Sequence, residues 1–132
     1  MAPALLEPPI NVLRASLHPD GLAPRIVNLA EWRHHLLGRL LDDAHRSGDP
    51  VLVRLHEELR SLPAPASRHP HGPTARIAVP LMLSPPDSDR VLSFLSTTTV
   101  FGSAIDITLA ELTLECFYPA DEATRQALTV TR

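Results

Sequence analysis

The sequence predicts an α+β domain with helices in its first half and an antiparallel sheet in its second half. Apolar residues recur at helical spacing from Leu29 to Ala44, whereas two-residue alternation and β-branched residues dominate from Ile77 onwards. The four prolines of residues 62–73 (LPAPASRHPHGP) exclude regular structure between the halves. We therefore expect one domain: a helical half (1–62), a Pro-rich linker (63–73), and a sheet half with a terminal helix (74–132).

Three helices are predicted in the first half. Asn28 can cap the longest, and Glu31 lies at the capping-box position; its apolar residues are Leu29, Trp32, Leu36, Leu37, Leu40, Leu41 and Ala44. Gly48 can end this helix and Asp49 can cap the next, whose apolar stripe is Leu52, Leu55 and Leu59. The two form a hairpin, and a shorter helix is predicted upstream, over Asn11 to His18.

Three strands and a last helix are predicted in the second half. The first, from Ile77 to Leu83, contains Pro80, which cannot donate a ladder hydrogen bond and indicates an edge or bulged strand. The second runs from Val91 to Phe101 and ends at an FG turn, which favours a meander. Alternation predicts a third, half-buried strand with an apolar side formed by Leu112, Leu114, Cys116 and Tyr118. Pro119 ends it, and Asp121 can cap a short helix.

The composition is that of a folded protein without a general affinity for nucleic acid. The chain has 132 residues, 44% of them hydrophobic, which suffices for one core. Its formal net charge of −3 gives no general attraction to phosphate backbones. Cys116 is the single cysteine, so no internal disulfide is possible, and its strand context predicts a buried apolar residue in a cytoplasmic protein. No segment has the roughly 20 apolar residues of a membrane helix.

Five segments, in the same order, resemble the ligand-binding domain of MmyB-like transcription regulators. They are NVLRASLHPDGL from Asn11, NLAEWRHHLLGRL from Asn28, GDPVLVRLHEEL from Gly48, VPLML from Val79, and the stretch from Leu92 to Asp121. The resemblance spans most of the chain. It implies a PAS-like antiparallel sheet with helices packed on one face, and a pocket between them for a small, apolar effector.

The resemblance also implies that parts of such a regulator are missing. The family's DNA-reading helix-turn-helix domain is absent, and only ten residues precede the segment at Asn11, where the family has its first strands. We therefore expect an N-terminally truncated domain with part of the sheet missing. The segment from Leu109 to Tyr118 then lacks its usual neighbour, and an unpaired apolar edge invites another chain. A homodimer, a domain-swapped assembly or a marginally stable fragment is expected.

The candidate ligand-binding residues come from the long helix and the second strand. Trp32, Leu36 and Leu40 can face the sheet and form the apolar wall that is typical of a small-molecule site; the facing candidates are Phe94, Leu95 and Phe101. Thr98, within a run of three threonines, can orient a ligand through its hydroxyl. Ordinary core packing accounts for the same residues, because a buried Phe or Leu contributes about 1.5–3 kcal/mol to folding.

Metal, enzyme and interaction functions are the alternatives. His34 and His35 point about 100° apart on a helix, and His69 and His71 lie in the linker, so neither pair predicts a metal site, and no cofactor is expected. An isomerase, cyclase or hydrolase on a small cone-shaped α+β domain would use acid and base groups, for which the candidates are His35, Asp106 and Tyr118. No nucleophile or phosphate-binding motif accompanies them, so no catalytic residue is assigned. An interaction-only module, binding a full-length regulator, is the third possibility.

Overall fold

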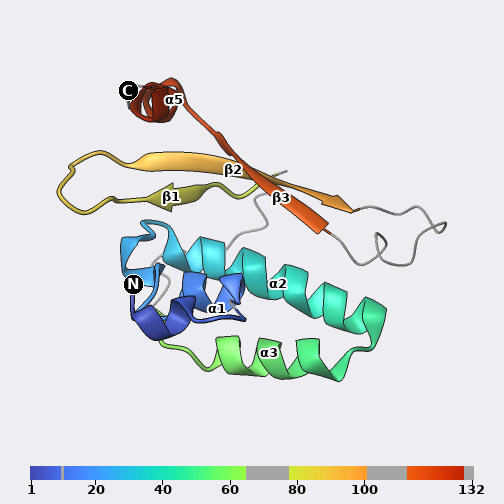
Figure 1. Ribbon diagram of the computed structural model, residues 1–132. Coiled ribbons are helices and arrows are strands. Elements are labelled where there is room, and N and C mark those ends of the chain that lie inside the picture. Colours follow the sequence, from blue (N-terminus) through green and yellow to red (C-terminus); the bar gives the residue numbers. More distant parts are fainter. Residues whose placement is uncertain (10, 65–77, 101–112, 130–132) are drawn as a thin grey trace.

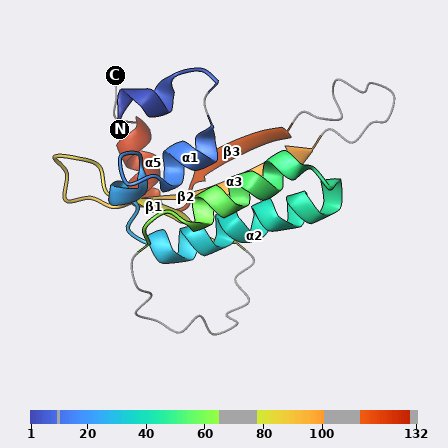
Figure 2. The same cartoon turned by 90° about the horizontal axis from the view of Figure 1, so that it is seen from below.

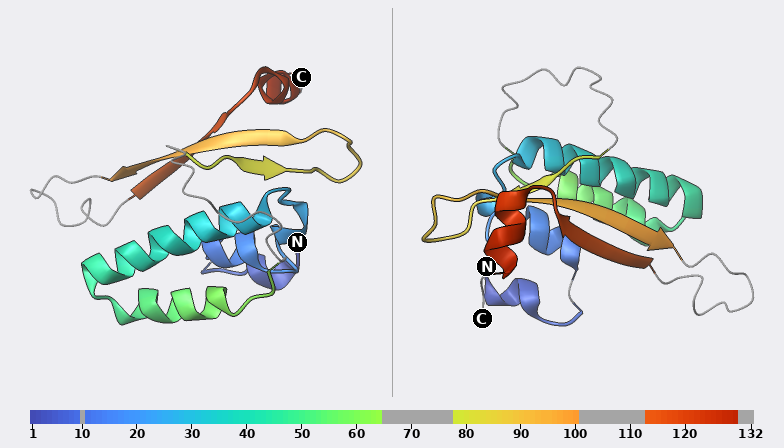
Figure 3. Two further views of the ribbon diagram at one scale, coloured as in Figure 1. Left: turned by 180° about the vertical axis from the view of Figure 1, so that it is seen from behind. Right: turned by 90° about the horizontal axis from the view of Figure 1, so that it is seen from above.

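The computed structural model describes residues 1–9, 11–64, 78–100 and 113–129, which form a helical layer against one face of an antiparallel sheet (Figure 1). In chain order the elements are η1 (Pro3–Leu6), α1 (Val12–Leu17), η2 (Ala23–Arg25), α2 (Leu29–Ser47), α3 (Pro50–Arg60), β1 (Leu81–Leu83), β2 (Leu92–Val100), β3 (Thr113–Pro119) and α5 (Glu122–Thr129). Helix α2 lies between the sheet and α3, and α5 lies on the other side of the sheet (Figures 1 and 3). The α+β fold with a partial sheet is confirmed.

Polar caps and a glycine set the ends of the first helices. Asn11 Oδ1 accepts a hydrogen bond from the Arg14 N–H at 3.0 Å, and Asp49 Oδ1 accepts one from the Val51 N–H at 2.9 Å. Helix α2 ends at Gly48, whose φ of 67° lies in the left-handed region that glycine adopts without a Cβ clash. The three helices predicted for the first half of the chain are confirmed.

Asn28 precedes α2 as predicted, but its side chain binds β1 and the Glu31 side chain instead of a backbone N–H of the first turn. Its Oδ1 accepts a hydrogen bond from the Met82 N–H at 3.1 Å. Its Nδ2 donates to the Pro80 carbonyl at 2.7 Å and to Glu31 Oε1 at 3.1 Å. The expected cap by the Asn28 side chain is therefore wrong, because the amide bonds to β1 and not to a backbone N–H of the first turn.

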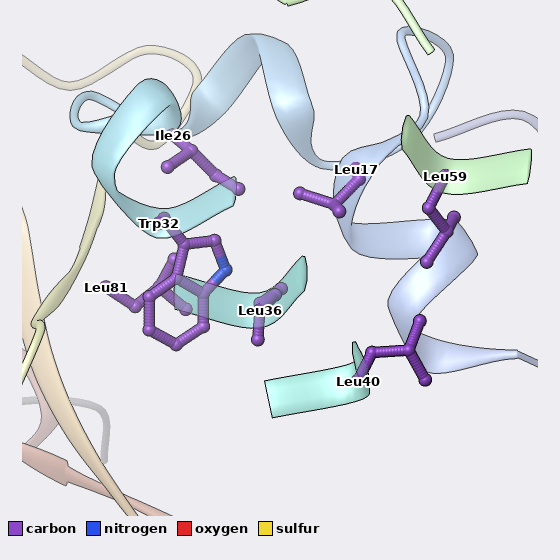
Figure 4. Packing of buried hydrophobic residues seen from close by; sticks show 7 residues of the cluster. All are labelled: Leu17, Ile26, Trp32, Leu36, Leu40, Leu59 and Leu81. Atoms are coloured by element: carbon purple, nitrogen blue, oxygen red, sulfur yellow. The ribbon is translucent and has the colours of Figure 1, made fainter. Parts of the chain in front are cut away.

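The core lies where α2 meets α1, α3 and β1 (Figure 4). Its buried members are Leu17, Ile26, Trp32, Leu36, Leu40, Leu59 and Leu81. Trp32, Leu36 and Leu40 are four residues apart, so one stripe of α2 supplies all three. Figure 2 shows α3 running alongside α2. The buried Leu59 of α3 belongs to the same core cluster as the α2 stripe. The predicted helical hairpin is the scaffold of this core.

The sheet has the order β1-β2-β3, and both neighbouring pairs are antiparallel, which is the predicted meander. Leu81 lies opposite Phe94, and Phe94 lies opposite Pro119. Strand β1 begins directly after Pro80 and is an edge strand of this sheet, as the proline indicated. Residues 65–77 of the linker and the first strand, the FG turn, and residues 109–112 lie outside the described residues.

The side of β3 that faces the core is not the side that the sequence predicted to be buried. We call the face toward α1 and α2 the inner face; it carries Leu81, Leu83, Phe94, Thr98, Glu115 and Phe117. The outer face carries Met82, Leu95, Leu114, Cys116 and Tyr118. The prediction that the Leu114 and Tyr118 side of β3 is buried is therefore wrong: these residues are 51% and 53% exposed. The pairing with β2 fixes Phe117, one residue away, on the side of the core.

Helix α5 is joined to the sheet through a buried threonine. Thr124 is fully buried, and its Oγ1 accepts a hydrogen bond from the Ser93 N–H at 2.9 Å. Asp121 Oδ1 accepts one from the Thr124 N–H at 2.7 Å, which places the helix start at the predicted cap. A side-chain hydrogen bond with Thr124 and, to a lesser extent, this backbone bond hold the pKa of Asp121 below its ordinary value. The predicted terminal helix is confirmed.

Candidate functional site

An apolar cavity of about 330 Å³ lies between the inner face of the sheet and the helices α1 and α2. Among the described residues, its lining consists of Met1, Val12, Leu13, Ala15, Ser16, Leu22, Trp32, Leu36, Leu81, Leu83, Phe94, Glu115 and Phe117. Ser16 and Glu115 supply the polar side chains of this set. The cavity is thus an apolar space with a few polar groups, which is the usual composition of a small-molecule site.

Three of the predicted ligand-binding residues line this cavity. Trp32 and Leu36 lie one turn apart on α2 and are 2% and 6% exposed, so they form a rigid wall that also belongs to the core. Phe94 approaches from the middle strand of the sheet and packs against the same cluster. The spacing of four residues on α2 and the inward side of β2 bring these three side chains together.

The remaining predicted residues lie elsewhere. Leu40, one turn beyond Leu36, is buried in the core and is not part of the cavity lining. Thr98 lies on the inner face and bonds to a side chain of α2. The prediction that Leu95 shares a wall with Phe94 is wrong, because adjacent strand residues point to opposite faces and Leu95 lies on the outer face. Phe101 lies outside the described residues.

Sequence reasoning missed the walls formed by α1 and β3. Helix α1 contributes Val12, Leu13 and Ser16, at a spacing that repeats after one turn. The inner face of β3 contributes Glu115 and Phe117. The α1 pattern was visible in the sequence as a short amphipathic helix. The role of β3 was hidden, because its outward residues Leu114 and Tyr118 are as apolar as Phe117.

Arg39 organises the polar side of the site. Its Nη2 donates to Thr98 Oγ1 at 2.7 Å, and its Nη1 lies 3.3 Å from Glu115 Oε1. The two charged side chains are 37% and 35% exposed, so solvent screens the pair and its net contribution to stability is about 0–1 kcal/mol. Its main effect is geometric, because it holds the Glu115 carboxylate beside the cavity.

His35 lies on α2 beside Trp32, with the two ring centroids 5.6 Å apart. Burial lowers the pKa of His35, and the positive charge of Arg39 lowers it further. Glu31 and Glu115 act in the opposite direction without reversing the shift. The imidazole next to the cavity wall is therefore neutral at neutral pH, which keeps this side of the site free of an additional positive charge.

The candidate catalytic groups are not brought together by the described structure. Tyr118 is exposed on the outer face of the sheet, whereas His35 is on α2, beyond the inner face. Asp106 lies outside the described residues, as do His69 and His71. Within the described ranges there is no group of three or more His, Cys, Asp or Glu side chains placed to hold a metal ion. None of the helices formed by these ranges is long and apolar enough to span a bilayer.

Comparison with known families agrees with the sequence resemblance. The family model of the MmyB-like transcription regulator ligand binding domain matches residues 1–130, which is nearly the whole chain. No curated protein and no solved structure matches it. A regulator's ligand-binding domain points away from an enzymatic role. The extent of the match and the apolar cavity under the sheet lead to one conclusion: the chain belongs to the family of MmyB-like transcription regulator ligand binding domains.

Proposed function

We propose that this chain senses a small, mainly apolar effector, which binds in the cavity between α1, α2 and the inner face of the sheet. The observation that carries the proposal is the cavity itself. Its volume of about 330 Å³ lies at the lower end of the range of about 300–1,000 Å³ that small-molecule sites occupy. The family match supports the same function, because it describes a ligand-binding domain of transcription regulators.

In the proposed complex the effector lies between a wall of core residues and a side that is open to solvent. Trp32, Leu36 and Phe94 contact the apolar body of the effector from the side of the core. Leu40 belongs to the same core cluster and follows Leu36 by one turn of α2, so we assign it a supporting place behind this wall. The exposed Val12, which lines the cavity and is 70% exposed, marks its solvent side. Phe101 stays a prediction for the same site.

The polar groups restrict the chemistry of the effector. Ser16 and Glu115 line the cavity, and the Glu115 carboxylate is an acceptor. Thr98 acts indirectly, since its hydroxyl accepts from Arg39, which in turn holds Glu115. An apolar molecule with one hydrogen-bond donor directed at Glu115 fits this arrangement best.

The proposal includes the assembly and setting of the chain. We propose one domain that works as a homodimer in the cytoplasm, alone or together with a full-length regulator. It makes no direct contact with DNA, because its formal net charge of −3 gives no general attraction to phosphate groups. The effector changes regulation through the assembly, and no cofactor is required.

The test uses a fluorescent apolar probe, 1-anilinonaphthalene-8-sulfonate, with the purified full chain. We expect saturable binding, and an affinity at least tenfold lower for Val12→Trp, whose larger side chain fills the solvent side of the cavity. Val51→Trp is the matched control, because Val51 is also an exposed valine near the start of a helix but does not line the cavity. Circular dichroism checks that both variants stay folded.

Two outcomes would count against the proposed site. Equal losses in both variants, or none in either, would place probe binding outside this cavity. Native mass spectrometry of the wild-type chain supplies an independent readout, since a bound effector that co-purifies adds a discrete mass. A chain that neither binds the probe nor carries such a mass would contradict the sensing function itself.

A further inference from the structure

The two edges of the sheet are protected very differently. Next to β1, the segment from Arg25 to Asn28 satisfies the outward backbone groups. The Val27 N–H donates to the Met82 carbonyl at 2.8 Å, and the Ser84 N–H donates to the Arg25 carbonyl at 2.8 Å. The Asn28 side chain binds the Met82 N–H and the Pro80 carbonyl. This edge is therefore closed to another chain.

The far edge of β3 has no strand partner among the described residues. It is seven residues long and carries large exposed apolar side chains: Leu114, Phe117 and Tyr118 are 51%, 47% and 53% exposed. Its one charged residue, Glu115, is paired with Arg39 and so gives little protection against pairing. A long, apolar and unpaired edge of this kind favours the addition of another strand.

The pairing with β2 determines which backbone groups of β3 point away from β2. The Ala120 N–H donates to the Ser93 carbonyl at 2.8 Å, so this pair, which continues the β2–β3 register, is hydrogen-bonded. Hydrogen-bonded and non-hydrogen-bonded pairs alternate along an antiparallel ladder. Cys116 therefore directs its backbone groups toward β2, whereas Glu115 and Phe117 direct theirs away from the sheet. Pro119 also points its nitrogen away, where the missing N–H costs no bond to β2.

We propose that β3 of a second copy pairs with this edge in antiparallel orientation, with the two-fold axis at Cys116. The two three-stranded sheets then form one continuous sheet. The inference rests on the homodimer of the proposed function and specifies which surface forms it. The occupant is a second copy because the strand is complementary to itself in this register.

Symmetry limits the possible registers. A two-fold axis that makes neighbouring strands antiparallel is perpendicular to the sheet, so the inner faces of both copies lie on the same side. Residues that lie opposite each other must then point to the same face of the sheet. This condition holds only if the residue nearest the axis lies opposite its own copy in the partner strand. Only an axis at Cys116 pairs all of β3, since Thr113 then faces Pro119.

Charge and backbone hydrogen bonds favour the same register. An axis at Glu115 would place two carboxylates opposite each other, and an axis at Phe117 would place Glu115 opposite Pro119. With the axis at Cys116, Glu115 faces Phe117 of the partner subunit. The outward N–H and carbonyl groups of these two residues then bond to each other. On the outer face Leu114 packs beside Tyr118 of the partner subunit, an apolar cross-strand pair.

Cys116 provides a direct readout of this geometry. In the proposed ladder it lies opposite its own copy in a non-hydrogen-bonded pair, for which the Cα atoms are about 4.5 Å apart. That separation is within the range of about 4.4–6.8 Å found in disulfides. Cys116 is free and partly accessible on the outer face. Diamide should therefore join two copies, since the two thiols give up two protons and two electrons to the reagent and form one disulfide.

The experiment combines solution mass with crosslinking of the full chain. We expect a dimer by multi-angle light scattering and a disulfide-linked dimer after diamide treatment. The matched control moves the thiol two residues along the same face, in Cys116→Ser with Leu114→Cys. There the new cysteine faces Tyr118 of the partner subunit instead of itself, so crosslinking should be at least tenfold slower.

A charge reversal tests the register without cysteine chemistry. Leu114→Lys combined with Tyr118→Lys places two positive charges opposite each other in both halves of the ladder, and should yield a monomer. Leu114→Lys combined with Tyr118→Glu places opposite charges there, and should restore the dimer. Both doubly substituted chains change exposed positions only.

The outcomes separate this inference from the proposed function. A wild-type monomer would contradict the homodimer and this interface together, while effector binding would still be tested by the probe. A wild-type dimer in which the thiol at position 114 crosslinks as fast as the one at 116, or in which both charged variants behave alike, would place the contact on another surface. The homodimer would then stand, and this interface would not.

Discussion

Arg39 and Glu115 join the helical layer to β3 beside the cavity, with Arg39 Nη1 at 3.3 Å from Glu115 Oε1. The same guanidinium donates to Thr98, so it binds two neighbouring strands from one helix. The pair therefore lies between three features: the apolar cavity, the edge of β3 that has no strand partner among the described residues, and His35, whose pKa responds to both charges. A substitution of Arg39 or Glu115 should therefore affect the cavity, the edge of β3 and the pKa of His35.

The first prediction concerns the pH dependence of folding stability. Burial and Arg39 lower the pKa of His35 below its ordinary value of about 6.5. In the window between the two values the unfolded chain binds more protons than the folded chain, so stability is complete above about pH 6.5 and falls as the pH decreases through the window. Urea denaturation at several pH values, followed by the fluorescence of the buried Trp32, measures this loss.

Substituting the histidine separates its contribution from the rest of the protein. His35→Gln should remove this part of the pH dependence, whereas His45→Gln, at an exposed position of the same helix, should leave it unchanged. Glu115→Gln should lower the pKa of His35 further, because it removes a charge that raises it. A nuclear magnetic resonance titration that found the pKa of His35 raised in that variant would contradict this account.

The second prediction compares two glycines of the helical half. A Cβ at Gly21 would lie 2.1 Å from the Ala15 carbonyl oxygen, which accepts a hydrogen bond from the Leu22 N–H, whereas a Cβ at Gly38 meets nothing within 4 Å. Gly21→Ala should therefore lower stability by about 1–3 kcal/mol. Gly38→Ala, within the exposed side of α2, should raise it by about 0.5–1 kcal/mol. Thermal and urea unfolding give both values, and equal effects would be inconsistent with the packing at Gly21.

The third prediction concerns the link between α2 and β1. Asn28→Ala leaves the Met82 N–H and the Pro80 carbonyl without their partner, at a cost of about 2–3 kcal/mol. Asn11→Ala is the reference, because that amide serves as a helix cap and its loss costs about 1 kcal/mol. Hydrogen exchange at the Met82 amide should accelerate in the first variant only. Similar losses in the two variants would mean that the tertiary bonds of Asn28 add nothing to a cap.

The fourth prediction concerns the attachment of α5. Thr124→Val keeps the shape of the fully buried side chain but removes the acceptor of the Ser93 N–H, which should cost about 1–3 kcal/mol. Thr124→Ser retains the hydroxyl and loses one methyl group, worth about 0.8 kcal/mol. Urea unfolding should thus rank valine as the more damaging substitution. The reverse order would show that packing, and not this hydrogen bond, holds the helix.

The helical half could be predicted because its signals are local. The caps Asn11 and Asp49, the terminating Gly48 and the repeat along α2 each act within a few residues of chain, so the sequence contains the whole cause. The same repeat placed Trp32 and Leu36 on the side of the site. Asn28 is the exception, because its amide could bind either its own helix or a strand more than fifty residues away, and the strand was reached.

The site was only partly predictable because a strand's burial depends on its neighbours. The residues from Leu114 to Tyr118 point alternately to the two faces of the sheet, and both sides carry large apolar residues. The local pattern therefore could not show which side is buried. The register with β2 made the choice and directed Phe117 and Glu115 to the cavity. The same alternation along β2 puts Leu95 on the outer face of the sheet and Phe94 on the inner face.

The sequence by itself determined the family, the α+β class, and the identity and order of most elements, because these follow from periodicity, caps and turns along the chain. The tertiary structure alone decided the depth of Leu40 and the α1 and β3 walls of the cavity. It also decided the contrast between the closed β1 edge and the β3 edge, which no other described strand covers. These depend on which distant segments meet. Such contacts are set by the register and packing of the whole domain, which no local pattern encodes.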